Sequence, residues 1–140
     1  MNKKLKKFIP KLVIFSLLVG ALVGVLELFI GHRFILDPLL YNQDPGFVYE
    51  SYFAPTFYGM TKSIVTAITV FLVYLAAFNT KLKPVIKAAI VGITGTIIFG
   101  IYYYLTFPHT SSNSSLLIGI VHFSFIGGIT YIVAKISKFK

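Results

Sequence analysis

The sequence lacks cysteine altogether and holds few charges, with only four acidic residues among 140. Without cysteine there is no disulfide, thiolate metal site, cysteine nucleophile or lipidated N-terminal cysteine. Charged residues make up 12% of the chain, whereas a soluble domain carries about 25%. A soluble fold this poor in charge could not cover its surface, so the composition indicates a membrane protein.

Four apolar runs are each near the length that crosses a hydrocarbon core of about 30 Å. We expect helices at about 12–31, 59–78, 84–107 and 116–134. The first run is too long for a signal-peptide core and no small-x-small cleavage site follows it, so we expect it to be retained. The sequence predicts an all-α integral membrane bundle of four transmembrane helices, forming a single domain over 1–140.

Basic residues gather at three places that flank these runs. Cytoplasmic loops and tails collect Lys and Arg, and this bias orients membrane proteins. Both termini and the loop between the second and third runs are therefore predicted to be cytoplasmic, an N-in/C-in topology. Only Arg33 and Lys62 fall on the outer side. The clustered lysines are Lys3, Lys4, Lys6, Lys7, Lys11, Lys81, Lys83, Lys87, Lys135, Lys138 and Lys140.

The net charge of +9 does not indicate nucleic-acid binding, because the lysines mark membrane borders and form no stripe on a folded face. Anionic lipid headgroups are the natural partner, at about 1 kcal/mol per basic residue near the surface. We expect membrane lipids as partners, and other membrane proteins or a homo-oligomer as further candidates. The location is the cell membrane if the chain is prokaryotic and the endoplasmic reticulum if it is eukaryotic.

The long connection at 32–58 is rich in aromatic residues. Seven of the eighteen residues over 41–58 are Phe or Tyr, and Pro and Gly punctuate the segment. A loop this apolar is expected to lie in the outer membrane interface, as a short helix or a re-entrant turn.

Small residues spaced by four indicate where the helices pack, because spans associate through close backbone approach. The first span has such a face around Gly20 and Gly24, and the third has a longer one. No internal repeat is evident, which disfavours an inverted-repeat transporter. The residues predicted to pack are Gly20, Gly24, Gly92, Thr96, Gly100, Gly127 and Gly128.

Ionisable residues inside a predicted span are costly and indicate function. Glu27, Lys62 and His122 share roughly one depth in the outer half of the membrane, with Tyr103 or Tyr104 nearby. Three interpretations stay open. Lys62 could snorkel to the interface while Glu27 makes one structural hydrogen bond; the group could form the polar end of a lipid or sterol pocket; or it could relay protons or ions.

No enzyme or metal site is expected. The chain has no Ser-His-Asp order, no phosphate-binding glycine loop and no carboxylate pair at a defined spacing. His and carboxylate residues on the outer side match no metal motif, so we predict neither metal nor cofactor. These outer residues are His32, Asp37, Asp44, Glu50 and His109.

Three short stretches resemble the insulin-induced gene (Insig) family of small sterol-responsive membrane proteins. Phe125-Ile126-Gly127-Gly128-Ile129-Thr130 is similar to the aromatic-x-Gly-Gly-Ile-Thr of the last Insig span. Tyr102-Tyr103-Tyr104 leading to Thr110-Ser111, and Pro55 with Gly59, resemble two other Insig helix boundaries. Insig proteins have six spans, whereas this chain has four and lacks their aspartate-bearing loop. The resemblance implies a non-enzymatic bundle with a central lipid-binding cavity.

The favoured function is therefore a non-enzymatic, Insig-like protein that binds a lipid or sterol-like ligand, with Glu27, Lys62, His122 and Tyr103 at the ligand. One alternative is an accessory subunit of a larger membrane complex, whose small-residue faces would contact partner helices. The other is a small transporter.

Overall fold

The computed structural model describes the backbone over 3–30, 53–106 and 112–139, and the side chains over 3–30, 59–102 and 116–139. Within these ranges the chain is all-helical. The helices are α1 (Lys3–Leu26), α3 (Phe53–Ala76), α4 (Pro84–Thr106) and α5 (Ser112–Ile136). Each contains a segment long and apolar enough to cross a membrane. The four predicted helices are confirmed as helices.

The helix boundaries differ from the prediction mainly at two starts. α1 begins at Lys3 instead of residue 12, because the basic segment consists largely of Lys and Leu, which favour helices. α3 begins at Phe53 with Pro55 in its first turn, where a missing N–H costs nothing. The last part of the aromatic connection is thus a helix continuous with α3, and its remainder over 31–52 lies outside the described residues.

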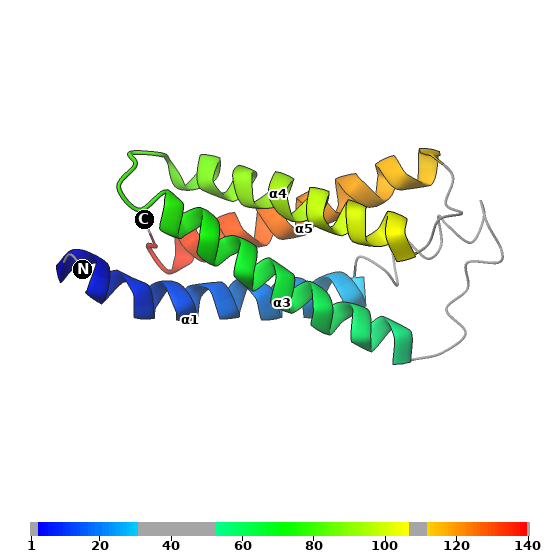
Figure 1. Cartoon of the computed structure of the whole chain (residues 1–140), viewed down its shortest axis with the longest axis horizontal. Helices are drawn as coiled ribbons and strands as arrows, with labels where there is room; N and C mark the ends of the chain where they lie inside the picture. Colours follow the sequence, from blue (N-terminus) through cyan, green and yellow to red (C-terminus); the bar gives the residue numbers. More distant parts are fainter. Residues whose placement is uncertain (1–2, 31–52, 107–111, 140) are drawn as a thin grey trace.

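The helices form two closely packed pairs, α1 with α3 and α4 with α5, joined by less extensive α3–α4 and α1–α5 contacts. The start of α1, the turn over 77–83 and the end of α5 lie at the same end of the bundle, on the left of Figure 1. We call this the lysine-bearing end, because the three lysine clusters of the sequence belong to these segments.

Glycines on α1 let its backbone approach α3. A Cβ added at Gly20 would lie 2.8 Å from the Ala67 Cβ and still closer to the Ser63 carbonyl oxygen. A Cβ at Gly24 would lie 2.6 Å from the Gly59 carbonyl oxygen. The small faces of these two helices therefore pack against each other, as expected for helices that associate without a hydrophobic driving force.

The α4–α5 pair uses glycine in the same way over part of its length. A Cβ at Gly92 would lie 3.1 Å from the Gly127 Cα, and the Thr96 methyl lies 3.8 Å from a Cβ at Gly119. At Gly100 and Gly128 no atom of the described residues lies within 4 Å of an added Cβ. Of the α4 residues predicted to pack, Gly92 and Thr96 thus lie at the contact with α5.

The outward surface of the bundle is strongly apolar. Ile14 is 69% exposed, Leu17 62% and Leu116 70%, and similar Ile, Leu and Val side chains cover the outside of all four helices. Water would oppose such a surface, whereas lipid tails would contact it without cost. The interior of the bundle contains both polar side chains and an apolar core around Val19, Val70 and Ile126.

Aromatic rings pack against one another at the lysine-bearing end. The Phe139 ring stacks on the Phe15 ring with centroids 4.4 Å apart, and it also contacts Phe8 and Tyr74. Phe139 reaches this place because Lys138 adopts a left-handed φ of 52° after α5. The Phe139 N–H then donates to the Ala134 carbonyl at 2.9 Å, which is the helix-ending pattern of a Schellman motif.

Candidate functional site

Glu27, Lys62 and His122 form a buried polar cluster in the half of the bundle away from the lysine-bearing end. Each comes from a different helix segment: Glu27 follows the last α-helical turn of α1, Lys62 lies in the third turn of α3 and His122 in the third turn of α5. Because α1 and α3 approach closely at Gly24, the Glu27 and Lys62 side chains lie at the same level of the bundle.

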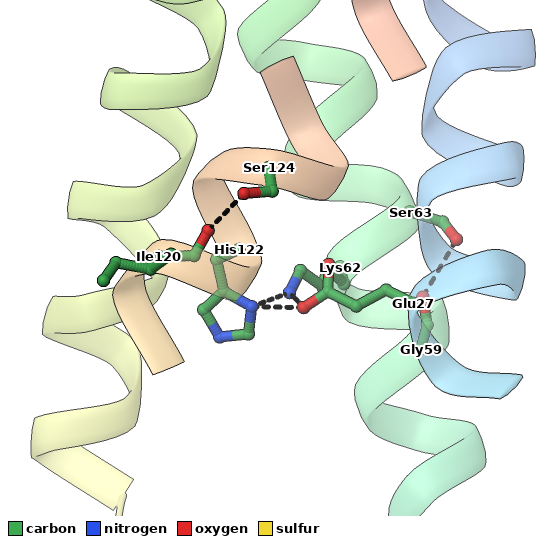
Figure 2. Close-up of polar contacts among 7 residues, drawn as sticks. All are labelled: Glu27, Gly59, Lys62, Ser63, Ile120, His122 and Ser124. Carbon is green, nitrogen blue, oxygen red and sulfur yellow. Dashed lines mark hydrogen bonds and ion pairs between the residues drawn. The ribbon is translucent and has the colours of Figure 1, made fainter. Parts of the chain in front are cut away.

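The three side chains contact one another directly. The Lys62 ammonium donates a hydrogen bond to Glu27 Oε1, and His122 Nδ1 contacts both the Lys62 Nζ and the same carboxylate oxygen. Figure 2 shows them pointing toward one another from α1, α3 and α5. All three are at most 1% exposed. The structure thus brings together the three ionisable residues that the sequence placed at one depth.

Phe99 adds the fourth helix to this cluster. The Lys62 Nζ lies 4.9 Å from the centroid of the Phe99 ring, a cation–π distance, and the ring centroid lies 5.9 Å from that of His122. The sequence predicts Tyr103 on α4 at this place instead, one turn further along. The side chain of Tyr103 lies outside the described residues. The sequence held one usable signal for Phe99: it falls on α4 at about the depth of His122.

The cluster joins the two helix pairs. Glu27 and Lys62 belong to the α1–α3 pair, while His122 and Phe99 belong to the α4–α5 pair. Within each pair, glycines bring the helices into close contact, and at the level of the cluster the two pairs are joined by polar and aromatic side chains. A shift of one pair relative to the other would therefore change these contacts first.

Because the cluster is buried, the protonation states of its three side chains differ strongly in free energy. A lone charge inside the bundle would be strongly disfavoured, but the carboxylate and the ammonium compensate each other when both are charged. His122 then adds a hydrogen bond in which its neutral ring nitrogen accepts from Lys62 or its protonated ring donates to Glu27. Gain or loss of one proton from this state changes the net charge of the cluster from zero to +1 or −1, so one charge of the three groups is then left without a counter-charge.

One oxygen of the cluster has no partner within the described part of the chain. Glu27 Oε1 receives both contacts, whereas Oε2 is buried and has no hydrogen-bond partner among the described residues. A carboxylate oxygen accepts hydrogen bonds, and a buried one without a donor costs free energy. The site can therefore accept a hydrogen bond from a hydroxyl or ammonium group.

Within 3–30, 53–106 and 112–139 no group of three or more His, Cys, Asp or Glu residues is placed to hold a metal ion. Four outer residues considered for a metal, His32, Asp37, Asp44 and Glu50, lie outside the described residues, as does His109.

No protein-family model, curated protein or solved structure matches the chain. The likeness to Insig proteins therefore rests on the three short motifs. Of these, the Phe125–Thr130 stretch lies in α5, where Gly127 packs against α4 and the Thr130 hydroxyl donates to the Ile126 carbonyl at 2.6 Å.

Proposed function

We propose that this chain is a non-enzymatic, multi-pass membrane protein, N-in and C-in, that binds a lipid or sterol-like amphiphile. The head group of the ligand is held by Glu27, Lys62 and His122, and its apolar body lies along the apolar helices. The ligand class that fits is an amphiphile whose head carries a hydroxyl or amino donor.

The observation that carries this proposal is the buried Glu27 carboxylate with one paired and one unpaired oxygen. Apolar side chains of similar size could join the two helix pairs at lower desolvation cost, so a purely structural role does not account for three ionisable groups there. Oε2 offers an acceptor to a ligand donor, while Lys62 and His122 contact the other oxygen of the same carboxylate. The Insig-like motifs support a ligand of the sterol type.

Native mass spectrometry in mild detergent tests this function. We expect the unmodified protein to retain endogenous lipid and the Glu27→Gln variant to lose it, since the amide places a donor or a weaker acceptor where the carboxylate was. Ser124→Ala is the matched control, because Ser124 is exposed on α5 and its hydroxyl bonds only to the Ile120 carbonyl at 2.8 Å (Figure 2). Equal lipid retention by all three proteins would refute the proposal.

One observation favours a second function, an accessory subunit of a larger membrane complex. Gly100 on α4 and Gly128 on α5 lie against nothing within 4 Å among the described residues, so their small faces are open to a further helix. Co-purifying subunits without retained lipid in the same mass spectra would support this function over ligand binding.

A further inference from the structure

Three more buried hydroxyl groups lie in the interior, toward the lysine-bearing end. Thr66 and Tyr74 are 0% exposed and Ser16 is 3% exposed. Their Oγ1, Oη and Oγ atoms have no hydrogen-bond partner among the described residues. Buried hydroxyls without a protein partner are commonly satisfied by internal water.

These hydroxyls continue the line that begins at Lys62. On α3, Thr66 follows Lys62 by one turn, about 6 Å, and Tyr74 follows Thr66 by about 12 Å along the axis and about 80° around the helix. Helical side chains lean toward the N-terminus of their own helix, so the Tyr74 hydroxyl leans toward Thr66. A gap remains along α3 between these two hydroxyls.

Ser16 on α1 falls within that gap. A Cβ at Gly20 would lie 2.8 Å from the Ala67 Cβ, and the Phe15 ring centroid lies 5.1 Å from that of Tyr74. Because Ser16 directly follows Phe15 and precedes Gly20 by one turn, its level is between Ala67 and Tyr74 on the antiparallel helix. The order along the bundle is therefore Lys62, Thr66, Ser16 and Tyr74.

The line ends at a buried lysine. Lys87 lies in the first turn of α4, is 4% exposed, and holds its Nζ 5.4 Å from the centroid of the Tyr74 ring. It belongs to the sequence cluster that was read as a topology signal, but it faces the interior, unlike Lys81 and Lys83, which are exposed. Polar groups thus extend from the Glu27 cluster to the lysine-bearing end.

We propose that Thr66, Ser16 and Tyr74 hold a file of internal waters through which the cluster of Glu27, Lys62 and His122 exchanges protons with the lysine-bearing end. At each step one oxygen receives a proton on one side and donates another on the opposite side. As a net result, water at the lysine-bearing end loses one proton and Glu27 or His122 gains one. Every hydroxyl ends with the same number of protons that it had at the start. The return transfer runs by the same steps.

The chain offers a matched control for this proposal. Thr69 lies on α3 between Thr66 and Tyr74 and is 3% exposed, but its hydroxyl donates to the Val65 carbonyl at 2.8 Å and needs no water. In lipid nanodiscs, NMR magnetisation transfer from water should be strong at the Thr66 methyl and weak at the Thr69 methyl. Absence of transfer at Thr66, or equal transfer at both, would overturn the proposal, and this measurement uses the unmodified protein.

A second measurement follows the proton itself. Exchange of the His122 imidazole N–H with solvent is observed in histidine-labelled protein, with His122→Gln used for assignment. Thr66→Val, Ser16→Ala and Tyr74→Phe should each slow this exchange about tenfold, the effect of losing one hydrogen bond's worth of stabilisation from the transfer barrier. Thr69→Val should leave the rate unchanged. Unaltered rates in all three hydroxyl variants would contradict the proposal, whatever ligand the cluster binds.

Discussion

Lys62 donates a hydrogen bond to Glu27 across the α1–α3 interface, and each of these side chains is only 1% exposed. Replacing Lys62 with Met would leave the Glu27 carboxylate buried without its ammonium partner. We expect the free energy of unfolding to fall by about 3–5 kcal/mol, the usual cost of breaking a buried ion pair on one side. Unfolding by sodium dodecyl sulfate in mixed micelles, followed by circular dichroism, measures it.

The double variant Glu27→Met/Lys62→Met is the control for that prediction. Removing both charges leaves apolar side chains of similar size, and such replacements are often neutral. The double variant should therefore be more stable than Lys62→Met. A double variant that is no more stable than the single one would show that the two side chains do not act as a pair.

Gly20→Ala should destabilise the bundle. The added Cβ would meet the Ser63 backbone carbonyl and lie 2.8 Å from the Ala67 Cβ, so the two helix backbones must separate. Overpacking of this kind costs about 1–3 kcal/mol. Gly128→Ala is the matched control, because no described atom lies within 4 Å of a Cβ at this position. The better helix propensity of Ala should there raise the free energy of unfolding by about 0.5–1 kcal/mol. Equal effects at both positions in the unfolding titration would contradict the α1–α3 contact.

Lys138→Gly should be more stable than Lys138→Ala. Both remove the same charge, but only glycine adopts the φ of 52° at this helix end without a steric penalty, which is about 1 kcal/mol for other residues. The difference between the two variants in the unfolding titration is thus expected to be about 1 kcal/mol. A smaller stability for Lys138→Gly would mean that the left-handed turn after α5 is not kept.

The absence of cysteine makes the proposed topology directly measurable. Single cysteines at Lys7, Asn79 and Ser137, all exposed at the lysine-bearing end, should react with a membrane-impermeant maleimide only from the cytoplasmic side. A cysteine at Asn113, in the first turn of α5, should react only from the opposite side. Labelling of any two of the first three from different sides would refute the N-in/C-in arrangement.

The helices and the meeting of Glu27, Lys62 and His122 follow from features that the sequence states directly. Apolar run length determines the spans, and in an antiparallel bundle residues at one depth become neighbours once small residues bring the helices together. Gly20 and Gly24 supply that approach. The three lysine clusters lie at one end of the bundle because successive helices run in opposite directions.

Other features depend on which way each helix is rotated, and no single-sequence pattern fixes that rotation. Small residues occur on more than one face of α4 and α5, so Gly100 and Gly128 could not be distinguished from Gly92 and Gly127 by spacing alone. Phe99 was one aromatic residue among many. Lys87 was counted with the exposed lysines, because burial of its side chain depends on the position of Tyr74.

The stacking of Phe139 on Phe15, with ring planes 2° apart, has a consequence for the order of assembly. Phe15 lies in α1 and Phe139 follows α5, and chains are made from the N-terminus onward, so Phe15 leaves the ribosome well before Phe139. The α1–α3 pair can form while α5 is still being synthesised. Helix α1 must wait for the segment after α5 before Phe139 can stack on Phe15, so early truncation would leave Phe8 and Phe15 facing lipid or a chaperone.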